Sequence, residues 1–229
     1  MVVAGVLTLA WAVVVWRWQD PFTALYTHWQ QSRLSANLDH QFAAYHPVRI
    51  DPTDLAAERL AISKDARTFR HTAKTGQAIG RITIARIGLK MVLVNGTDHE
   101  TLKKGPGRDA RSYMPGQDRL VYIAGHRTTY LAPFAHIEQL VPGDTVTLEL
   151  PYATIVYAVT GHVIVPSDDI GRLKSHGFEE VALQACHPRF FATHRYIAYA
   201  RPTEVIPRNG SPYFLDARGR LKLAQPSGR

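Results

Sequence analysis

Short runs in which apolar and polar residues alternate dominate the sequence between residues 79 and 201. The stretch 81–87 alternates cleanly, with the period of a β-strand that buries one face. Further apolar runs, with turn residues such as Pro151-Tyr152 between them, occupy 91–94, 120–124, 145–150, 154–160, 181–185 and 196–200. Many short strands separated by turns are typical of a closed or nearly closed barrel. We therefore predict a mainly β domain over residues 77–206, with short connecting helices at 99–103, 133–140 and 167–173.

The pattern before this domain has the spacing of helices. Apolar residues recur at near-helical intervals from residue 20 to residue 45, between the start signal Asp20-Pro21 and the stop signal Pro47. A second helix is predicted from Thr53 to about Phe69, and the polar, basic stretch 63–77 is interpreted as a linker. We expect residues 19–76 to form a helical juxtamembrane stalk and linker.

The two ends of the chain differ in character from the rest. Residues 1–16 contain no charge and tryptophans close the run, which favours an uncleaved transmembrane anchor over residues 1–18. A cleavable signal peptide is the alternative, but the run lacks a basic leading region and a small-residue cleavage site. Residues 207–229 are rich in proline, glycine and basic residues, so we expect a basic, mostly disordered tail in which 213–215 is apolar enough to dock locally.

Composition narrows the function mainly by exclusion. The 229 residues carry a net charge of +8, but residues 201–229 alone hold six Lys or Arg and two Asp or Glu, a net of +4. Half of the excess therefore lies in the tail, which argues against a nucleic-acid partner. No Cys and His spacing matches a zinc site, no acidic cluster suggests calcium, and Gly105-Pro106-Gly107 lacks the context of a phosphate-binding loop. We expect no metal and no cofactor.

The single cysteine, Cys186, stands where chemistry is best supported. An apolar run leads into it, Pro188 lies in a polar loop, and an alternating run follows Arg195. If the two runs are antiparallel neighbours, facing Cβ atoms lie about 4.5–5.5 Å apart, so a thiolate and a guanidinium can share one substrate. The thiolate is a nucleophile and arginine can hold a developing oxyanion. The competing interpretation is that a lone cysteine is more often a small buried hydrophobe.

A proton carrier is also needed, and His126 is the best placed of the eleven histidines. The apolar strand 120–124 stops at Gly125 and His126 follows directly, where functional residues are often found, although any one histidine is more often a surface or packing residue. Papain-like peptidases carry the histidine after the cysteine, the reverse of the order here. Cysteine L,D-transpeptidases carry Ser-His-Gly-Cys around the nucleophile, and this sequence lacks that motif.

Taken together, these motifs resemble those of the sortases. The resemblance rests on Ile123-Ala124-Gly125-His126-Arg127, on the strand-end Cys186-His187-Pro188 and on Arg195, nine residues after the cysteine. The run Gly-His-Arg-Thr-Thr-Tyr at 125–130 and the short cysteine-to-arginine spacing most resemble the class E housekeeping type of actinobacteria and relatives. The resemblance covers roughly residues 77–201.

The resemblance implies a fold and a set of site residues. The fold is a sortase-like eight-stranded β-barrel with short connecting helices, preceded by an N-terminal membrane helix and a helical stalk. The implied catalytic residues are Cys186 as nucleophile, His126 as proton donor and Arg195 as the oxyanion-stabilising group. The expected substrate-binding residues are Thr128, Thr129, Tyr130 and Ala185. Ala182 and Ala185 depart from the family, which usually carries threonine at both positions.

The activity that the resemblance implies is transpeptidation. A thiolate would cleave an LPXTG- or LAXTG-like sorting signal of secreted proteins between Thr and Gly, form a thioester, and pass the protein to an amine of a peptidoglycan precursor or cross-bridge. The expected location is the cell membrane, with one membrane-spanning helix and the catalytic domain outside. Two alternatives stay open: a cysteine peptidase in which water resolves the thioester, and a non-catalytic module of the same fold that binds the cell wall.

Overall fold

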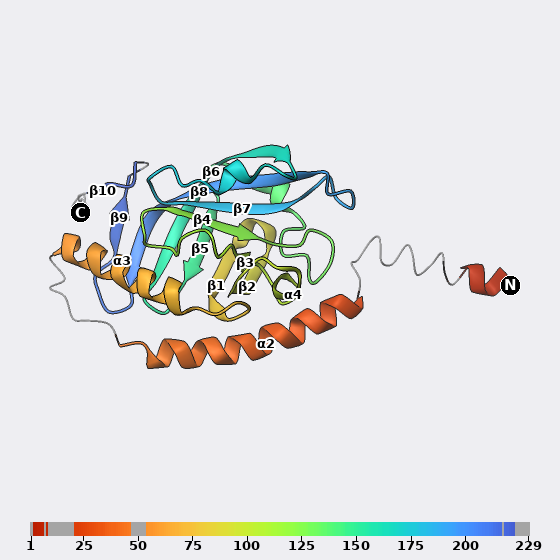
Figure 1. Cartoon of the computed structure of the whole chain (residues 1–229), viewed down its shortest axis with the longest axis horizontal. Coiled ribbons are helices and arrows are strands. Elements are labelled where there is room, and N and C mark those ends of the chain that lie inside the picture. Colours follow the sequence, from red (N-terminus) through yellow and green to blue (C-terminus); the bar gives the residue numbers. More distant parts are fainter. Residues whose placement is uncertain (1, 7, 9–20, 47–53, 217, 223–229) are drawn as a thin grey trace, which may run out of the picture.

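A β-barrel forms the body of the molecule, and two long helices lie against it (Figure 1). The structure, a computed structural model, describes residues 2–6, 8, 21–46, 54–216 and 218–222. The strands of the barrel are β1 (Ala78–Ile84), β2 (Leu89–Asn95), β3 (Gly107–Arg108), β4 (Leu120–Ala124), β5 (Thr145–Glu149), β6 (Ala153–Pro166), β7 (Glu180–His187) and β8 (His194–Pro207).

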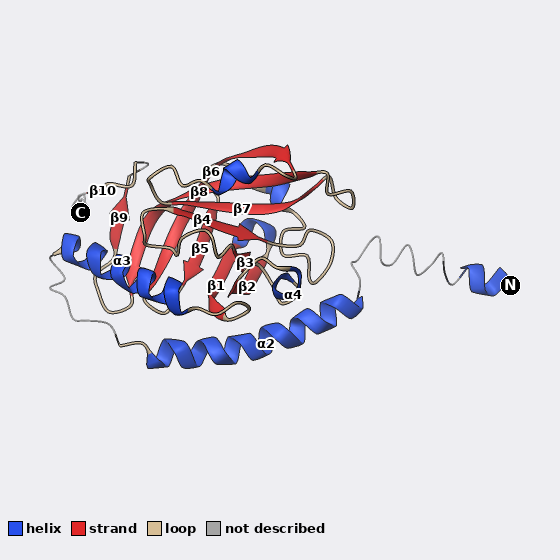
Figure 2. Cartoon of the chain, in the orientation of Figure 1, coloured by secondary structure: helices blue, strands red, loops and turns tan. Residues whose placement is uncertain are grey.

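The eight strands close on themselves in the order β1-β2-β3-β4-β7-β8-β6-β5 and back to β1 (Figure 2). The pairs β2/β3 and β4/β7 are parallel, and the other pairs are antiparallel. The predicted eight-stranded barrel is confirmed, and β5 and β6 form a hairpin around the turn residues Pro151-Tyr152. Closure leaves no free edge within the ring, which removes the sites at which strands of other chains could pair.

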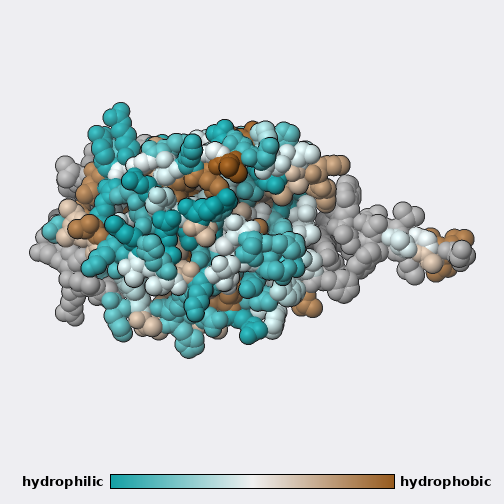
Figure 3. All heavy atoms as spheres, in the orientation of Figure 1, coloured by the Kyte–Doolittle hydropathy of each residue, from teal (hydrophilic) through white to brown (hydrophobic). Residues whose placement is uncertain are grey.

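Alternation along the strands separates the barrel core from its outer face. Val181, Leu183 and Ala185 of β7 belong to the main apolar core, whereas Ala182 packs in a separate cluster with Tyr122. This is the period of two that a strand imposes on its side chains. The face shown in Figure 3 is mostly hydrophilic.

Short helical turns connect the strands. They are η1 (Ala85–Ile87), α4 (His99–Leu102), η2 (Ile137–Gln139) and η3 (Ile170–Leu173). The turn predicted at 99–103 is confirmed, and Asp98 caps it by accepting from Thr101 N. The helix predicted at 133–140 is shorter than expected. The backbone N–H groups of Phe134 and Ala135 donate to His126 and Ala132 instead, in a turn rather than a helix.

The first long helix, α2 (Pro21–Ala44), packs on β1 and β2. Leu34 and Leu38 are buried against Val92 and Val94. The side-chain amide of Gln31 adds hydrogen bonds to the backbone in the same contact. Its amide oxygen accepts from Val92 N at 2.6 Å and its amide nitrogen donates to the carbonyls of Val92 and Lys104 at 3.1 and 2.7 Å. The predicted stalk helix is thus an integral part of the domain.

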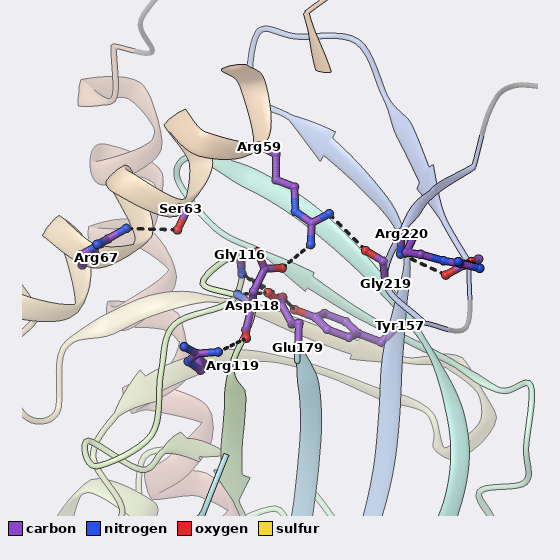
Figure 4. A network of polar contacts seen from close by, with 11 residues as sticks. Arg59, Ser63, Arg67, Gly116, Asp118, Arg119, Tyr157, Glu179, Gly219 and Arg220 are labelled. Carbon is purple, nitrogen blue, oxygen red and sulfur yellow. Dashed lines mark hydrogen bonds and ion pairs between the residues drawn. The ribbon is translucent and has the colours of Figure 1, made fainter. Parts of the chain in front are cut away.

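The second long helix, α3 (Leu55–Thr72), is fixed by charged groups at the end of the barrel where β7 begins (Figure 4). Arg59 forms an ion pair of 2.6 Å with Asp118. Next to this pair the buried carboxylate of Glu179 accepts from Tyr157 Oη at 2.6 Å and from the backbone N–H groups of Gly116 and Asp118. Burial raises the pKa of Glu179, and these donors offset part of that effect.

Helix α3 also corrects the predicted linker. It begins behind the N-cap Asp54, whose side chain accepts from Ala57 N, close to the predicted start at Thr53. It then continues to Thr72, so most of the stretch 63–77 is helical rather than a linker. The reason is an apolar stripe within the polar sequence, because Ile62 and Ala66 are buried in the main core and Phe69 packs against it.

The two ends of the chain differ in how far the structure tests them. Among the described helices, none combines the length and the apolar character that crossing a bilayer requires. Of the predicted anchor, residues 1, 7 and 9–18 lie outside the described residues, so the anchor stays a prediction.

The tail is more ordered than we expected. Strand β9 (Tyr213–Leu215) pairs with β8, and β10 (Leu221–Lys222) pairs with β9. The docking expected for 213–215 is confirmed, because Tyr213 and Leu215 are buried in the main core. The expectation of disorder is wrong for the described part of the tail, up to residue 222. Residues 223–229 lie outside the described residues.

The packing of α2 generates a stability prediction. Leu38 has no exposed surface, so Leu38→Ala is expected to lower the free energy of unfolding by about 2–5 kcal/mol, since it leaves a cavity under the helix. Leu25→Ala in the same helix is the matched control, because Leu25 is largely exposed. Denaturant unfolding of the purified chain measures both. Equal values for the two variants would show that α2 does not pack as described.

Candidate active site

Three strand segments meet at one end of the barrel and bring the predicted catalytic residues together. Strand β7 pairs antiparallel with β8 so that Cys186 lies opposite Arg195, which meets the condition that the sequence argument set for a shared substrate. On its other side β7 runs parallel to β4, with Ala124 opposite Gln184. Continuing that register by two residues sets His126 level with Cys186, and neighbouring strands lie about 4.7–4.9 Å apart.

The three side chains share a cavity on the outer face of the barrel. Cys186, His126 and Arg195 all line a cavity of about 340 Å³. Residues of β4, of the connection around η3 and of the segment 97–111 complete the lining. The thiol of Cys186 is free and half-buried. It is therefore reachable from the cavity, unlike the packed core cysteine of the competing interpretation.

His126 lies in a partly buried position beside Phe134. Gly125 is required before it, because a Cβ atom there would lie 2.7 Å from the Phe134 ring. Burial lowers the pKa of His126, with a smaller contribution from His99, so the neutral form is favoured. Its Nε2 atom is buried and has no hydrogen-bond partner among the described residues. A ring nitrogen in this state is suited to exchange a proton with a substrate.

Arg195 is oriented by the loop that it follows. Its Nη1 atom donates to the carbonyls of Ala192 and His194, at 2.8 and 3.0 Å. In the described part of the chain the guanidinium group of Arg195 makes no other hydrogen bonds. Its remaining N–H groups can therefore donate to an anionic oxygen in the cavity.

A second arginine, which the sequence analysis did not single out, joins the histidine loop to the cysteine strand. Arg127 is 5% exposed and donates to the carbonyl oxygen of Cys186 at 3.0 Å. The same Nη1 atom lies 3.1 Å from Nδ1 of His187, and Nη2 forms an ion pair of 2.7 Å with Glu138. Because Arg127 follows His126 directly, this contact sets the histidine loop against the backbone of the nucleophile.

The loop after His126 is in turn supported by α2. Tyr130 N donates to Thr23 Oγ1 at 3.2 Å, and the Tyr130 ring lies 5.1 Å from the His126 ring. Tyr130, Leu131 and Ala132 all have positive φ values, between 39° and 60°, which L-residues adopt only when the surroundings hold them there. The first turn of α2 thus contributes to the position of the histidine.

The comparisons with known proteins agree with this geometry. The family model for the sortase domain matches residues 82–203, more than half of the chain.

The chain belongs to the sortase family.

Curated relatives of this sortase include members named for two classes. Sortase D from Bacillus subtilis (strain 168) is 34% identical over 143 residues, which are 61% of this chain and 70% of that protein. Sortase SrtE1 from Streptomyces coelicolor is 32% identical over 100 residues, which are 39% of this chain and 28% of that protein. These relatives support membership of the sortase family, but they belong to different classes and do not single out class E.

Solved sortase structures share the fold. A sortase D5 transpeptidase from Clostridium perfringens superposes with a TM-score of 0.61 at 20% identity, over 76% of this chain and 98% of that one. Sortase E from Streptomyces avermitilis superposes with a TM-score of 0.53 at 29% identity, over 58% of this chain and 93% of that one. At 20% identity the first of these shows the fold alone.

The structure does not place all of the predicted substrate-binding residues at the cavity. Ala185 has no exposed surface and lies in the barrel core, on the face opposite to Cys186, so its side chain does not reach the cavity. Thr128, Thr129 and Tyr130 are half-buried in the histidine loop and are not among the residues that line the cavity. Of these, Tyr130 is the one whose ring contacts His126.

Gln184 and Tyr122 are among the lining residues of this sortase that sequence reasoning missed. Gln184 lies two positions before Cys186 and therefore on the same face, and Tyr122 Oη is 3.3 Å from Gln184 Oε1. Counting strand positions in twos from Cys186 would have found Gln184 and excluded Ala185. Among the described residues no cluster of metal-binding side chains is present.

The position of Arg127 generates an activity prediction. Arg127→Ala is expected to lower kcat/KM for the sortase reaction by about 10²-fold, because the histidine loop is no longer fixed against the Cys186 carbonyl. Arg127→Lys should not restore activity, since a single ammonium cannot make the forked contacts to Glu138 and Cys186. Steady-state kinetics with a peptide substrate measures the effect. Arg220→Ala, at the far end of the molecule, is the matched control, and an equal loss in both variants would contradict a positioning role.

The burial of His126 generates a pH prediction. Its pKa in the folded chain is lowered from the ordinary value near 6.5, so the unfolded chain binds the proton more readily. The stability that His126 contributes is fully present when the pH is above the pKa of the unfolded chain. It is lost as the pH falls from that pKa towards the lower pKa of the folded chain. Wild type should therefore lose more unfolding free energy than His126→Gln between about pH 7 and pH 5. Identical pH profiles for the two proteins would refute the lowered pKa.

Proposed function

We propose that this sortase is a membrane-anchored cysteine transpeptidase of the class E type. It would cleave an LPXTG- or LAXTG-like sorting signal between Thr and Gly and attach secreted proteins to the cell wall. The observation that carries the proposal is the cavity shared by Cys186, His126 and Arg195. The anchor is residues 1–18, and the catalytic domain lies outside the cell membrane.

In the first half-reaction His126 takes the proton of the Cys186 thiol, and the resulting thiolate attacks the Thr–Gly carbonyl carbon. The carbonyl oxygen becomes negative, and the guanidinium of Arg195 stabilises it. The C–N bond then breaks, and His126 gives its proton to the glycine amine as it leaves. A thioester between Cys186 and the threonine remains.

In the second half-reaction an amine of a peptidoglycan precursor or cross-bridge attacks the thioester. His126 accepts the proton of that amine, Cys186 leaves as a thiolate, and a new amide joins the secreted protein to the wall component. Division into two steps lets an amine compete with water for the acyl group, which is the chemical difference between transfer and hydrolysis.

The class assignment rests on the run at 125–130 and on the spacing from Cys186 to Arg195. The Bacillus subtilis sortase D shares a larger part of its length with this chain than SrtE1 does. A panel of signal peptides that differ at the second residue therefore belongs in the test of the substrate. Turnover of peptides with Pro but not Ala at that position would contradict the class E proposal and leave the transpeptidase proposal intact.

The activity is tested with a sorting-signal peptide and a primary amine. Mass spectrometry should detect an exchanged product with wild type and none with Cys186→Ala. Arg195→Ala should lower kcat/KM by about 10²–10³-fold, as expected for a lost oxyanion donor, and His126→Ala should also reduce it severely. His28→Ala and Arg220→Ala serve as matched controls. Exchange by Cys186→Ala would disprove the mechanism.

The same assay separates the alternatives. A cysteine peptidase would release the free acid at the same rate with and without the amine. A non-catalytic module would give neither product, and Cys186 would not be labelled by a thiol-reactive analogue of the signal. The half-buried, unpaired thiol of Cys186 favours the catalytic function over the module.

A further inference from the structure

Exposed apolar side chains gather at the end of the molecule that carries the active site. Phe190 and Phe191, in the connection between β7 and β8, are 62% and 77% exposed. Leu25 and Trp29, in the first half of α2, are 71% and 52% exposed, and Tyr26 between them is also exposed. We call these five residues the aromatic surface.

The two parts of the aromatic surface come from the same end of the fold. Figures 1 and 2 show the β7–β8 connection and the start of α2 at the same end of the longest axis. Figure 3 shows apolar atoms at that end, as well as near the top centre and at the opposite end of the mostly hydrophilic face. The cavity lies there as well, because its residues Cys186 and Arg195 each lie one position inside the strand ends that flank the connection.

The β7–β8 connection presents its two phenylalanines from a defined backbone. Phe190 and Ala192 have φ values of 73° and 54°, in the left-handed region that bulky residues rarely adopt. The N–H groups of Phe191 and Ala192 both donate to the carbonyl of Pro188, at 3.3 and 3.2 Å. Strained conformations of this kind persist where surrounding contacts hold them, often at functional sites.

The two chain segments that carry the aromatic surface contain arginine and no Asp or Glu. The sequence from 181 to 195 has no Asp or Glu but has Arg189 and Arg195, and the sequence from 21 to 38 has none but has Arg33. The Arg33 guanidinium lies 4.8 Å from the centroid of the Trp29 ring. The connection around η3, which carries Asp168 and Asp169, adjoins the β7–β8 connection, because Ser167 N donates to the carbonyl of Thr193 at 3.2 Å. Exposed aromatic side chains with arginines in the same segments fit an interface of anionic lipid headgroups.

The start of the chain points to the same partner. The uncharged residues 1–16 precede α2, so they join the domain at the end that bears the aromatic surface. A membrane reached by that run would face this end of the molecule rather than the end that carries β9 and β10.

We propose that the aromatic surface lies on a bilayer that contains anionic lipid, so that the catalytic cavity opens beside the membrane. The inference rests on the proposed function, in which the enzyme works at the cell membrane, and deepens it by naming the surface that orients the domain. Phe190 and Phe191 enter the headgroup region, and α2 stands with its first turns at the lipid. The cavity then meets substrates that are themselves held at the membrane.

The test places a fluorescent reporter at one position of the full chain at a time. In a Cys186→Ala background, Phe191→Cys is labelled with the environment-sensitive dye NBD and reconstituted into vesicles of phosphatidylglycerol and phosphatidylcholine that contain a doxyl-quencher lipid. Phe190→Cys provides a second reporter in the connection. Phe214→Cys, an exposed phenylalanine of β9 at the other end of the molecule, is the matched control. Thermal unfolding confirms that each labelled chain is folded.

We expect the dye at positions 190 and 191 to be quenched several-fold more than the dye at position 214. We also expect this quenching to weaken when phosphatidylcholine replaces phosphatidylglycerol. Equal quenching at the two ends of the molecule would overturn the proposal, and so would a loss of charge dependence. Without lipid, the dye at 191 could also become shielded from water as the protein concentration rises. That result would overturn the proposal as well, because the partner would then be a second copy of the chain. Without the Cys186 thiol the result does not depend on turnover, so its failure is distinct from failure of the transpeptidase proposal.

Discussion

The active site depends on one structural constraint, the pairing of β7 with β4 on one side and with β8 on the other. The parallel register with β4 sets His126 level with Cys186, and the antiparallel register with β8 sets Arg195 opposite it. A slip of one residue in β7 would turn Cys186 into the core, because side chains alternate between the faces of a strand. The core positions Val181, Leu183 and Ala185 therefore fix the orientation of the nucleophile as much as they stabilise the barrel.

Around this register, contacts from other parts of the chain hold the loops. Arg127 links the histidine loop to the carbonyl of Cys186, and Thr23 accepts from the backbone of Tyr130 beside the His126 ring. Neither residue lines the catalytic cavity. Their effect is to limit the motion of His126 relative to the sulfur, which matters because proton transfer needs short and directed contacts. The stalk helix α2 is for this reason part of the unit that forms the candidate active site.

The two ends of the barrel have different roles. At one end the strand termini form the cavity, and the segments that carry the exposed aromatic side chains lie at the same end. At the other end the polar network of Arg59, Asp118 and Glu179 joins α3 to the barrel, and β9 and β10 extend the sheet from β8 (Figure 4). The buried carboxylate of Glu179 is stabilised by several donors at once, which is how a charge can be kept away from water.

Local patterns in the sequence determined much of this protein. Alternation predicted most of the strands, and helical spacing predicted α2 and most of α3. The strand-end positions of His126, Cys186 and Arg195 singled out three residues that meet at the cavity. Each of these signals lies within a few neighbouring residues. Only the tertiary structure decided that β7 lies between β4 and β8 and that Arg127 reaches Cys186. It also decided that Ala185 faces the core. The extension of α3 to Thr72 and the addition of β9 and β10 by the tail were likewise visible only in the structure. These features depend on contacts between residues far apart in the chain, and strands of two or three residues are too short to carry a pattern of their own.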